Sequence, residues 1–384
     1  MLTLAAGAAH ADGCSQQSVT RAAVLVLDAD RTLAALPVSE DKQTEVSIAA
    51  RKAIAAMKDR LNDYAVATMH CAPEKRAALA VHKALTEFAG VKLPESGPAK
   101  EPSSSEAHYG GGLLFDVSNL SSDVLGIAAH FGIACGEDTM LMIFERRGDA
   151  WAETLRTQSA PYKTVAGGWW SFDYGAVRDK DGHWFVVTKN VAPWCSSTWS
   201  EIRYQALRPG PDADHPRTLL SKADSIWWGT DRTGDLKVDA KGFDLRWRAE
   251  SMDGDVHNRE WIARYEVRDD RVIRVAPIAE SPRDFADEWV RLRWPEAKAW
   301  TLNATHGLKP LHDALRKQHY FTYDSVRRCG DEDHIQVEVE PSGGGARHIY
   351  FQVFGKKLLQ MRDVSYAADP HCKGPNLYDA DHPQ

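Results

Sequence analysis

The chain has 384 residues, which is long for a single hydrophobic core and predicts two or three domains. Hydrophobic residues make up 43% and charged residues 26% of it, which is typical of soluble globular proteins and excludes a disordered or fibrous chain. The formal net charge of −7 argues against a surface that follows phosphate backbones, so we expect no nucleic-acid partner. Two counts stand out, six cysteines and 13 tryptophans.

The first residues have the pattern of a secretory leader. The alanine-rich stretch MLTLAAGAAHA ends in Ala9-His10-Ala11, the small-x-small pattern that precedes a signal-peptidase site. We therefore expect residues 1–11 to be a signal-peptide remnant and the protein to be periplasmic or secreted. Because no basic residue opens the stretch, two alternatives stay open, a start further upstream or a plain alanine-rich tail. No run of 18 apolar residues occurs, so the sequence predicts no transmembrane span.

The cysteines fit an exported protein. They fall in three neighbouring pairs along the chain, and an oxidising compartment would favour one disulfide within each pair. The predicted disulfides are Cys14–Cys71, Cys135–Cys195 and Cys329–Cys372, although sequence alone leaves other connectivities open. No C-x-x-C spacing occurs, so we expect no metal cluster and no cofactor.

Residues 12–91 form the predicted helical N-terminal segment. Ser39 is placed to cap a helix whose apolar positions recur at helical spacing from Val46 onward, and a second helix follows Pro73. Both apolar stripes are rich in alanine, so we expect a helical hairpin that leans on a larger neighbour. Three prolines and a run of three serines then predict a linker over residues 92–108.

Residues 109–280 have the pattern of a large antiparallel β domain. Short strand-like runs follow one another without helical spacers, and in 243–250 the side chains of Phe243, Leu245 and Trp247 share one face. We expect a β-meander. Whether it folds as a propeller-like domain, a barrel or a sandwich stays open.

A repeat of about 60 residues is suggested within this segment. The motif Asp-x-x-Gly occurs at 123–126, 179–182 and 239–242, and Phe144, Tyr204 and Tyr265 follow at similar spacings. Each repeat has room for about four strands, the size of one propeller blade. Chance similarity of composition is the alternative explanation.

Residues 281–384 predict a small α+β domain. Ser281-Pro282 marks a helix start, and a second helix is expected over 309–318. Alternating strands are expected at 335–340, 348–354 and 358–366. The predicted fold is thus predominantly β with an α+β part.

No recognised catalytic motif occurs, so whether the protein is an enzyme stays undecided. His306, His312 and His319 lack the spacing of a zinc site, and packed or exposed histidines are the simpler interpretation. The sequence Asp179-Lys180-Asp181-Gly182 resembles part of a calcium loop but fits a hairpin turn better. We therefore expect no metal site.

The tryptophans suggest a binding surface. In a Trp-Trp pair on a strand, one ring faces the core and the other faces outward, where it can stack on a sugar or fill a partner's pocket. Core packing of the same rings is the alternative. The candidate ligand-binding residues are Trp169, Trp170, Trp227, Trp228, Arg203 and Arg264.

The leading functional prediction is an exported, disulfide-stabilised, non-catalytic binding or envelope-associated module for a glycan or protein ligand. The alternative is a secreted hydrolase acting on glycans, with acids from the β loops or from Asp284, Asp287 and Glu288. Favourable placement of these acids at a helix start is the simpler interpretation. A structural role within an envelope complex is a third possibility.

Overall fold

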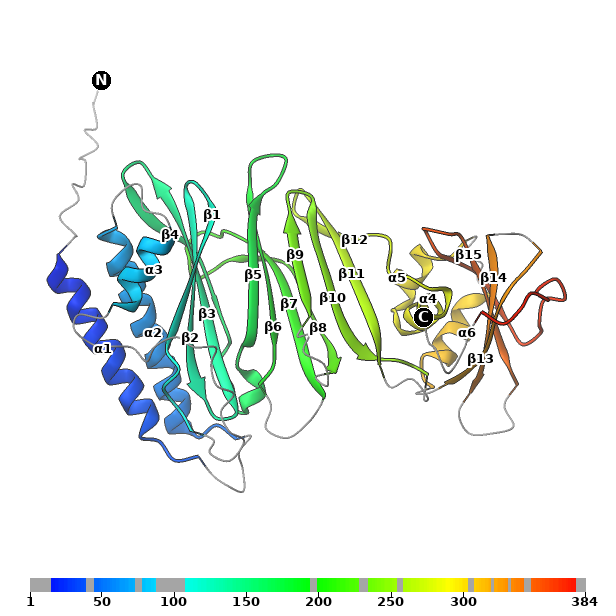
Figure 1. Ribbon diagram of the computed structural model, residues 1–384, viewed down its shortest axis with the longest axis horizontal. Coiled ribbons are helices and arrows are strands. Elements are labelled where there is room, and N and C mark those ends of the chain that lie inside the picture. The colour runs from blue at the N-terminus through cyan, green and yellow to red at the C-terminus, as the bar shows by residue number, and fades with distance from the viewer. Residues whose placement is uncertain are drawn as a thin grey trace. The chain divides into compact units, whose positions relative to one another are not determined.

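The computed structural model describes residues 15–38, 45–72, 78–87, 108–193, 199–227, 234–253, 258–302, 307–318, 321–330, 333–341 and 347–377. Its strands form four antiparallel sheets of four strands each, and none of the described sheets closes into a barrel. The predominantly β fold with an N-terminal helical hairpin is therefore confirmed (Figure 1). The chain divides into two compact units, Met1–Asp224 with Val238–Ala240, and Ser225–Lys237 with Lys241–Gln384.

All four sheets are meanders in which strands adjacent in sequence are adjacent in space. The first contains β1 (Leu114–Ser121), β2 (Val124–Ile133), β3 (Gly136–Arg147) and β4 (Ala150–Gln158). The second contains β5 (Trp170–Arg178), β6 (Trp184–Val191), β7 (Trp199–Arg208) and β8 (Arg217–Trp227). The third contains β9 (Asp235–Asp239), β10 (Gly242–Glu250), β11 (Asn258–Arg268) and β12 (Arg271–Arg274). The fourth contains β13 (Phe321–Arg328), β14 (His334–Pro341), β15 (Ile349–Phe354) and β16 (Gln360–Ser365).

The suggested repeat falls on equivalent places in three successive meanders. The three Asp-x-x-Gly motifs lie at the connections β1–β2, β5–β6 and β9–β10. The three aromatic residues lie on the third strand of each meander, Phe144 on β3, Tyr204 on β7 and Tyr265 on β11. One sequence repeat thus corresponds to one four-stranded sheet.

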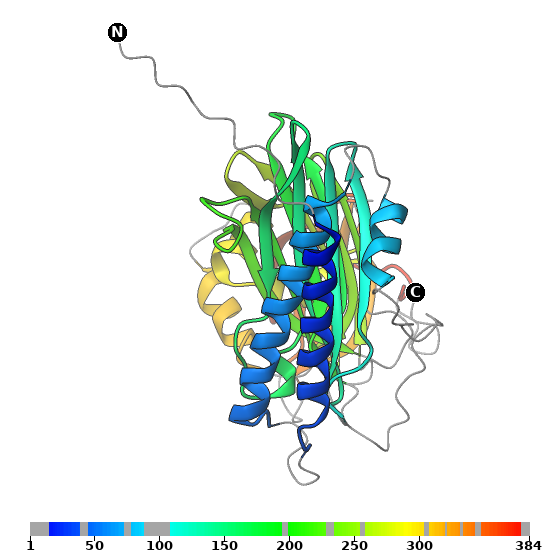
Figure 2. The same ribbon diagram turned by 90° about the vertical axis from the view of Figure 1, so that its left-hand side faces the viewer.

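The N-terminal helices cover one face of the first sheet. They are α1 (Gln16–Ala34), α2 (Ile48–His70) and α3 (Ala78–Thr86). Figure 2 shows α1 and α2 side by side in front of the strands. Their buried side chains share one core with the sheet, in which the rings of Tyr64 and Phe115 meet edge to face at 5.7 Å.

The predicted hairpin differs from the structure in two details. Ser39 lies outside the described residues, but residues 45–47 are not helical, and the helix begins at Ile48, where the Ser47 hydroxyl accepts the Ala50 N–H at 3.1 Å. α1 lies within the segment predicted as helical, but no separate helix was identified there, because it contains several β-branched residues of modest helix propensity. Packing against α2 is what stabilises such a helix.

The second sheet packs on the opposite face of the first, so the first unit has three layers (Figure 1). The interface is made of small and branched side chains such as Val124, Ala176 and Val186. Gly126 permits the close approach, because a Cβ atom there would lie 2.5 Å from the Tyr174 ring. A side chain at this position would therefore force the two sheets apart.

A buried ion pair joins α2 to the first sheet. Lys58 Nζ lies 2.8 Å from Asp138 Oδ2, and both side chains are almost completely buried. The same carboxylate accepts hydrogen bonds from the Ser159 and Tyr162 hydroxyls and from the Trp169 N–H. Asp138 therefore connects the helix, the sheet and the segment that leads into β5.

We predict that Lys58→Met destabilises the first unit by about 3–5 kcal/mol, because Asp138 would remain buried without its counter-ion. Arg60→Met is the matched control on the same helix. Its ion pair with Asp63 is exposed and should contribute only about 0–1 kcal/mol. Urea unfolding followed by far-UV circular dichroism measures both. Equal stabilities of the two variants would contradict the assigned role of Asp138.

In the second unit, three helices cover one face of the fourth sheet (Figure 1). They are α4 (Pro282–Arg291), α5 (Trp294–Ala299) and α6 (Leu308–Leu315). The predicted start of α4 is confirmed, since the Ser281 hydroxyl accepts the Asp284 N–H at 3.1 Å. The fully buried ring of Trp289 lies at the centre of this core, 6.4 Å from the ring of Phe351. The three expected strands correspond to β14, β15 and β16, whereas α5 and β13 were not predicted.

The domain boundaries expected from the sequence stay predictions. None of the helices in the described ranges is both long and apolar enough to cross a membrane.

Candidate functional site

The fourth sheet has two unlike faces. Val337, Val339 and Phe351 point into the core beneath α4–α6. The residues between them point to the opposite face, where Glu338 lies opposite Tyr350, and Gln336 opposite Gln352. We call this second surface the outer face. Apart from Phe354, which stacks on His334, the side chains of β14 and β15 on this face are polar, which is unusual for a sheet surface that is partly shielded from water.

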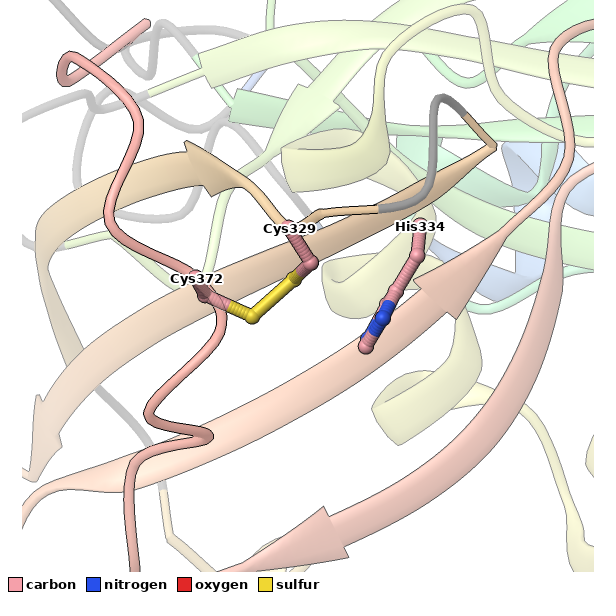
Figure 3. Close-up of side chains that lie close together, drawn as sticks. All are labelled: Cys329, His334 and Cys372. Atoms are coloured by element: carbon pink, nitrogen blue, oxygen red, sulfur yellow. A yellow bond between two sulfur atoms is a disulfide. The ribbon is translucent and has the colours of Figure 1, made fainter.

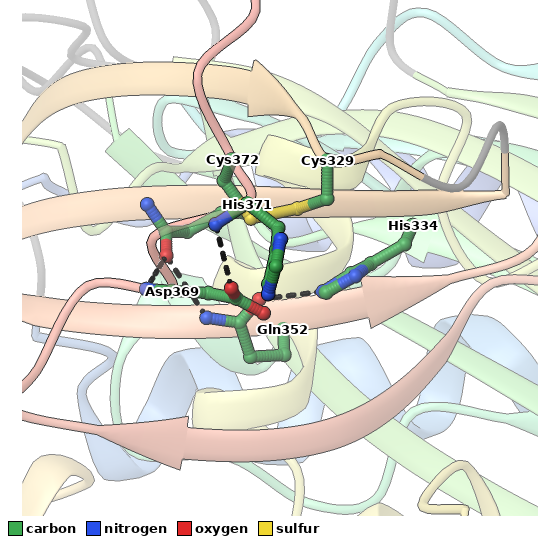
Figure 4. Close-up of a disulfide and its surroundings, with 7 residues drawn as sticks. Cys329, His334, Gln352, Asp369, His371 and Cys372 are labelled. Carbon is green, nitrogen blue, oxygen red and sulfur yellow. Dashed lines mark hydrogen bonds between the residues drawn. A yellow bond between two sulfur atoms is a disulfide. The ribbon is translucent and has the colours of Figure 1, made fainter.

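The C-terminal tail, residues 366–377, covers one half of the outer face (Figure 4). The backbone N–H of Asp369 donates to Gln336 Oε1 at 2.7 Å. Cys372 then forms a disulfide with Cys329 at the end of β13, and Asn376 pairs with the edge of that strand. The other half of the face surrounds Glu338, and we call it the open half. Among the described residues, the tail reaches only its edge, where the Asn376 amide donates to the Asp324 carbonyl oxygen at 3.3 Å.

The Cys329–Cys372 disulfide confirms one of the three predicted pairs. Cys71 and Cys135 are also disulfide-bonded. The remaining two cysteines, Cys14 and Cys195, lie outside the described residues, so the other two pairings stay predictions. No cysteine of the described part of the chain is free.

His334 lies beside this disulfide (Figure 3). Its Nε2 is 2.6 Å from Gln352 Oε1, and the Gln352 amide nitrogen donates to Gln336 Oε1 at 3.0 Å. Since the Gln352 oxygen only accepts, Nε2 of His334 carries the hydrogen of this bond. The chain of hydrogen bonds runs from His334 to the tail at Asp369 and holds the tail on the sheet (Figure 4).

The same residues would form a metal-binding set only after reduction. Possible ligand atoms of Cys329, His334 and Cys372 lie within 4.8 Å of one another. While the two sulfurs are bonded to each other, neither is a thiolate, and thiolates are the form that binds zinc. In the oxidised protein this cluster is a structural anchor of the tail.

In the open half, Glu338 is the centre of a second cluster. Its carboxylate accepts hydrogen bonds from the Ser325 hydroxyl at 2.6 Å and the Tyr350 hydroxyl at 2.9 Å. His348 Nδ1 lies 3.1 Å from Glu338 Oε1 and 3.6 Å from Asp324 Oδ2. Burial and, next, the bond to Glu338 raise the pKa of Tyr350 to about 12, so its hydroxyl stays protonated and donates at neutral pH.

The predicted aromatic residues are distributed over both units. Trp169 is buried, and its ring stacks on Phe172 at 5.7 Å. Trp170 begins β5 and Trp227 ends β8, and both are partly exposed. Trp228 lies outside the described residues. The Trp169 ring therefore packs inside the first unit, whereas Trp170 and Trp227 retain accessible surface.

The two predicted arginines are paired with carboxylates. Arg203 lies on β7 and forms an ion pair with Glu201. Arg264 lies on β11, and its guanidinium donates twice to Asp244, at 2.8 Å and 2.6 Å. Their charges are thus largely neutralised within their own sheets.

The acids suggested for a hydrolase are engaged in a buried ionic network. Arg259 lies between Asp287 and Glu288, at 2.9 Å and 3.0 Å. Arg274 approaches the second oxygen of Glu288 at 2.7 Å, and Arg291 approaches Asp287. Both carboxylates are almost fully buried, so they stabilise the fold and do not face a substrate.

The other candidates from the sequence also have structural roles. His312 packs edge-on against the Trp289 ring at 4.7 Å, and its burial lowers its pKa. Asp179 accepts the N–H groups of Asp181 and His183 and pairs with Arg208 at 2.6 Å, as a turn residue does. His306 and His319 lie outside the described residues.

Neither a protein-family model nor a curated protein matches the sequence.

Glu137 is an unusual acid that sequence reasoning missed. It follows Gly136 at the start of β3, where a Cβ atom would lie 3.6 Å from the Trp170 ring. Burial and then the neighbouring charge of Asp138 raise the pKa of Glu137 from 4.5 to about 7. No pattern in the sequence indicates this shift, because it depends on the packing around the hairpin.

We predict that Glu137→Gln stabilises the first unit most at alkaline pH. From pH 4.5 to 7 the unfolded chain releases this proton while the folded chain keeps it, so the stability of the natural protein falls as pH rises. The advantage of the variant should grow across this window to about 3 kcal/mol and then remain level. Urea unfolding at pH 4.5, 6 and 8 measures it. A difference that does not change with pH would refute the raised pKa.

We also predict that the double variant Cys329→Ser/Cys372→Ser loses about 4 kcal/mol, as expected for closing a loop between residues 43 positions apart. The measurement is urea unfolding of both proteins without reductant. Under reductant the two should unfold at the same urea concentration. A difference that persists in reductant would mean that the serines, and not the lost cross-link, cause the effect.

Proposed function

We propose that the protein is an exported, disulfide-stabilised binding module whose ligand is a glycan held on the open half of the outer face. The observation that carries this proposal is the cluster of Asp324, Glu338, His348 and Tyr350, which presents hydrogen-bonding groups and rings together on one sheet surface.

The cysteines support a location outside the reducing cytosol. Cys71, Cys135, Cys329 and Cys372 are all disulfide-bonded. Structural disulfides persist in the periplasm and outside the cell and are rare in reducing compartments. The alanine-rich leader pattern at residues 1–11 supports the same location.

The carboxylates support binding over hydrolysis. A glycosidase needs two carboxyl groups that face each other across a substrate. Asp287 and Glu288 are held by Arg259 inside the fold instead. In the open half, Asp324 and Glu338 both lie beside His348, at 3.6 Å and 3.1 Å, and so belong to one cluster.

The polarity of the open half supports a glycan over a protein ligand. The cores of protein interfaces are depleted of charged residues, whereas this surface carries the two carboxylates of Asp324 and Glu338 close together. Carboxylates accept hydrogen bonds from sugar hydroxyls, and aromatic rings stack on sugar faces. The rings of His348 and Tyr350 lie nearly parallel, with an interplanar angle of 22°, and offer such a stacking surface.

We predict that Tyr350→Ala weakens glycan binding at least tenfold, because it removes both a stacking ring and the donor that orients Glu338. The measurement is a panel of soluble neutral and acidic polysaccharides, followed by titration calorimetry with the best ligand. Tyr366→Ala is the matched control, since Tyr366 is exposed just after β16.

Two results would contradict the proposal. One is a folded protein that retains no polysaccharide of the panel at millimolar concentration. The other is an equal loss of affinity in both tyrosine variants, because only Tyr350 lies in the cluster.

A further inference from the structure

Three potential metal ligands from three segments converge in the open half. Asp324 lies on β13, Glu338 on β14, and His348 directly precedes β15. One ligand atom from each lies within 4.8 Å of the other two. Antiparallel pairing of β14 with β15 and with β13 brings them together, although 24 positions separate the first from the last.

The distances from His348 to the two carboxylates are close to those between neighbouring ligands around zinc. In a tetrahedral site with bonds of about 2.0–2.2 Å, neighbouring ligand atoms are about 3.3–3.6 Å apart. His348 Nδ1 lies 3.1 Å from Glu338 Oε1 and 3.6 Å from Asp324 Oδ2. Only small side-chain adjustments are therefore needed to surround one ion.

The charges of the cluster also favour a cation. Among the residues that the structure describes, no lysine or arginine forms an ion pair with Asp324 or Glu338. His348 Nδ1 is shielded from solvent, yet it forms no hydrogen bond with any described residue. An imidazole nitrogen that makes no hydrogen bond, together with two nearby carboxylates, is a donor set that a divalent ion can bind.

Neighbouring side chains hold the central ligand in place. Ser325 and Tyr350 donate one hydrogen bond to each oxygen of Glu338. Partners of this kind orient metal-binding carboxylates, and their loss commonly lowers metal affinity about 10–100-fold. The two hydrogen bonds from Ser325 and Tyr350 leave further lone pairs on the Glu338 carboxylate with which it can bind an ion.

We propose that Asp324, Glu338 and His348 form a binding site for a divalent first-row transition metal, with zinc as the ion to test first. Two carboxylates and one imidazole suit zinc and manganese better than calcium, which prefers oxygen ligands alone. Three protein ligands leave at least one coordination position open to water or to a ligand. This inference does not rest on glycan binding, because the metal is measured without any glycan.

The test is zinc titration calorimetry on the full chain, stripped with EDTA and kept oxidised. We expect one zinc ion per chain with a micromolar or lower dissociation constant. His348→Ala and Glu338→Gln should each weaken binding at least tenfold, and Tyr350→Phe should weaken it less. His215→Ala is the matched control, because His215 pairs with Asp212 at 2.7 Å on the surface.

Circular dichroism in EDTA establishes that the variants are folded. His348→Ala and Glu338→Gln each test the zinc site independently of the other. The proposal is overturned if the natural protein binds no zinc at 100 µM, or if His348→Ala and His215→Ala bind equally. Binding that appears only after the disulfides are reduced would also overturn it, because the ion would then occupy Cys329, His334 and Cys372.

Discussion

The constraint on which the candidate site depends is that the two faces of the fourth sheet are covered differently. Helices α4–α6 bury one face of it around Trp289, and the tail covers half of the other face through the Cys329–Cys372 disulfide and Gln336. Polar groups beneath the tail, such as His334, satisfy one another. In the open half, Asp324 is about 56% and His348 about 42% exposed, whereas Glu338 between them is about 16% exposed. The same strands therefore supply both a structural anchor and a surface available to ligands.

Ion pairs decide which acids are available for chemistry. Asp138 and Glu288 are buried and matched to Lys58 and Arg259, so their charges stabilise the packing of helices on sheets. Asp324 and Glu338 have no such partner among the described arginines and lysines. The absence of such ion pairs among the described residues thus distinguishes the open half from the buried networks.

Local patterns in the sequence predicted the strands better than the site. Alternation identified β10 and β14, and the Asp-x-x-Gly motifs marked equivalent connections, because both signals depend on neighbouring residues. The burial of Trp169 and Asp287 was not predictable from the sequence, because it depends on which distant residues pack against them. Glu338 and His348 both lie in strands that alternation predicted, one before and one after the Gly-rich turn. Their proximity to Asp324 required the pairing of β13, a strand that the sequence did not reveal.

The most direct test of the open half as the functional surface is crystallographic. Crystals of the oxidised protein soaked in zinc, with data collected on both sides of the zinc absorption edge, locate the ion without any assumption about affinity. If zinc binds at the proposed site, we expect an anomalous peak at about 2.0–2.2 Å from carboxylate oxygens of Asp324 and Glu338 and from His348 Nδ1. A peak only elsewhere, or none at this cluster, would contradict it.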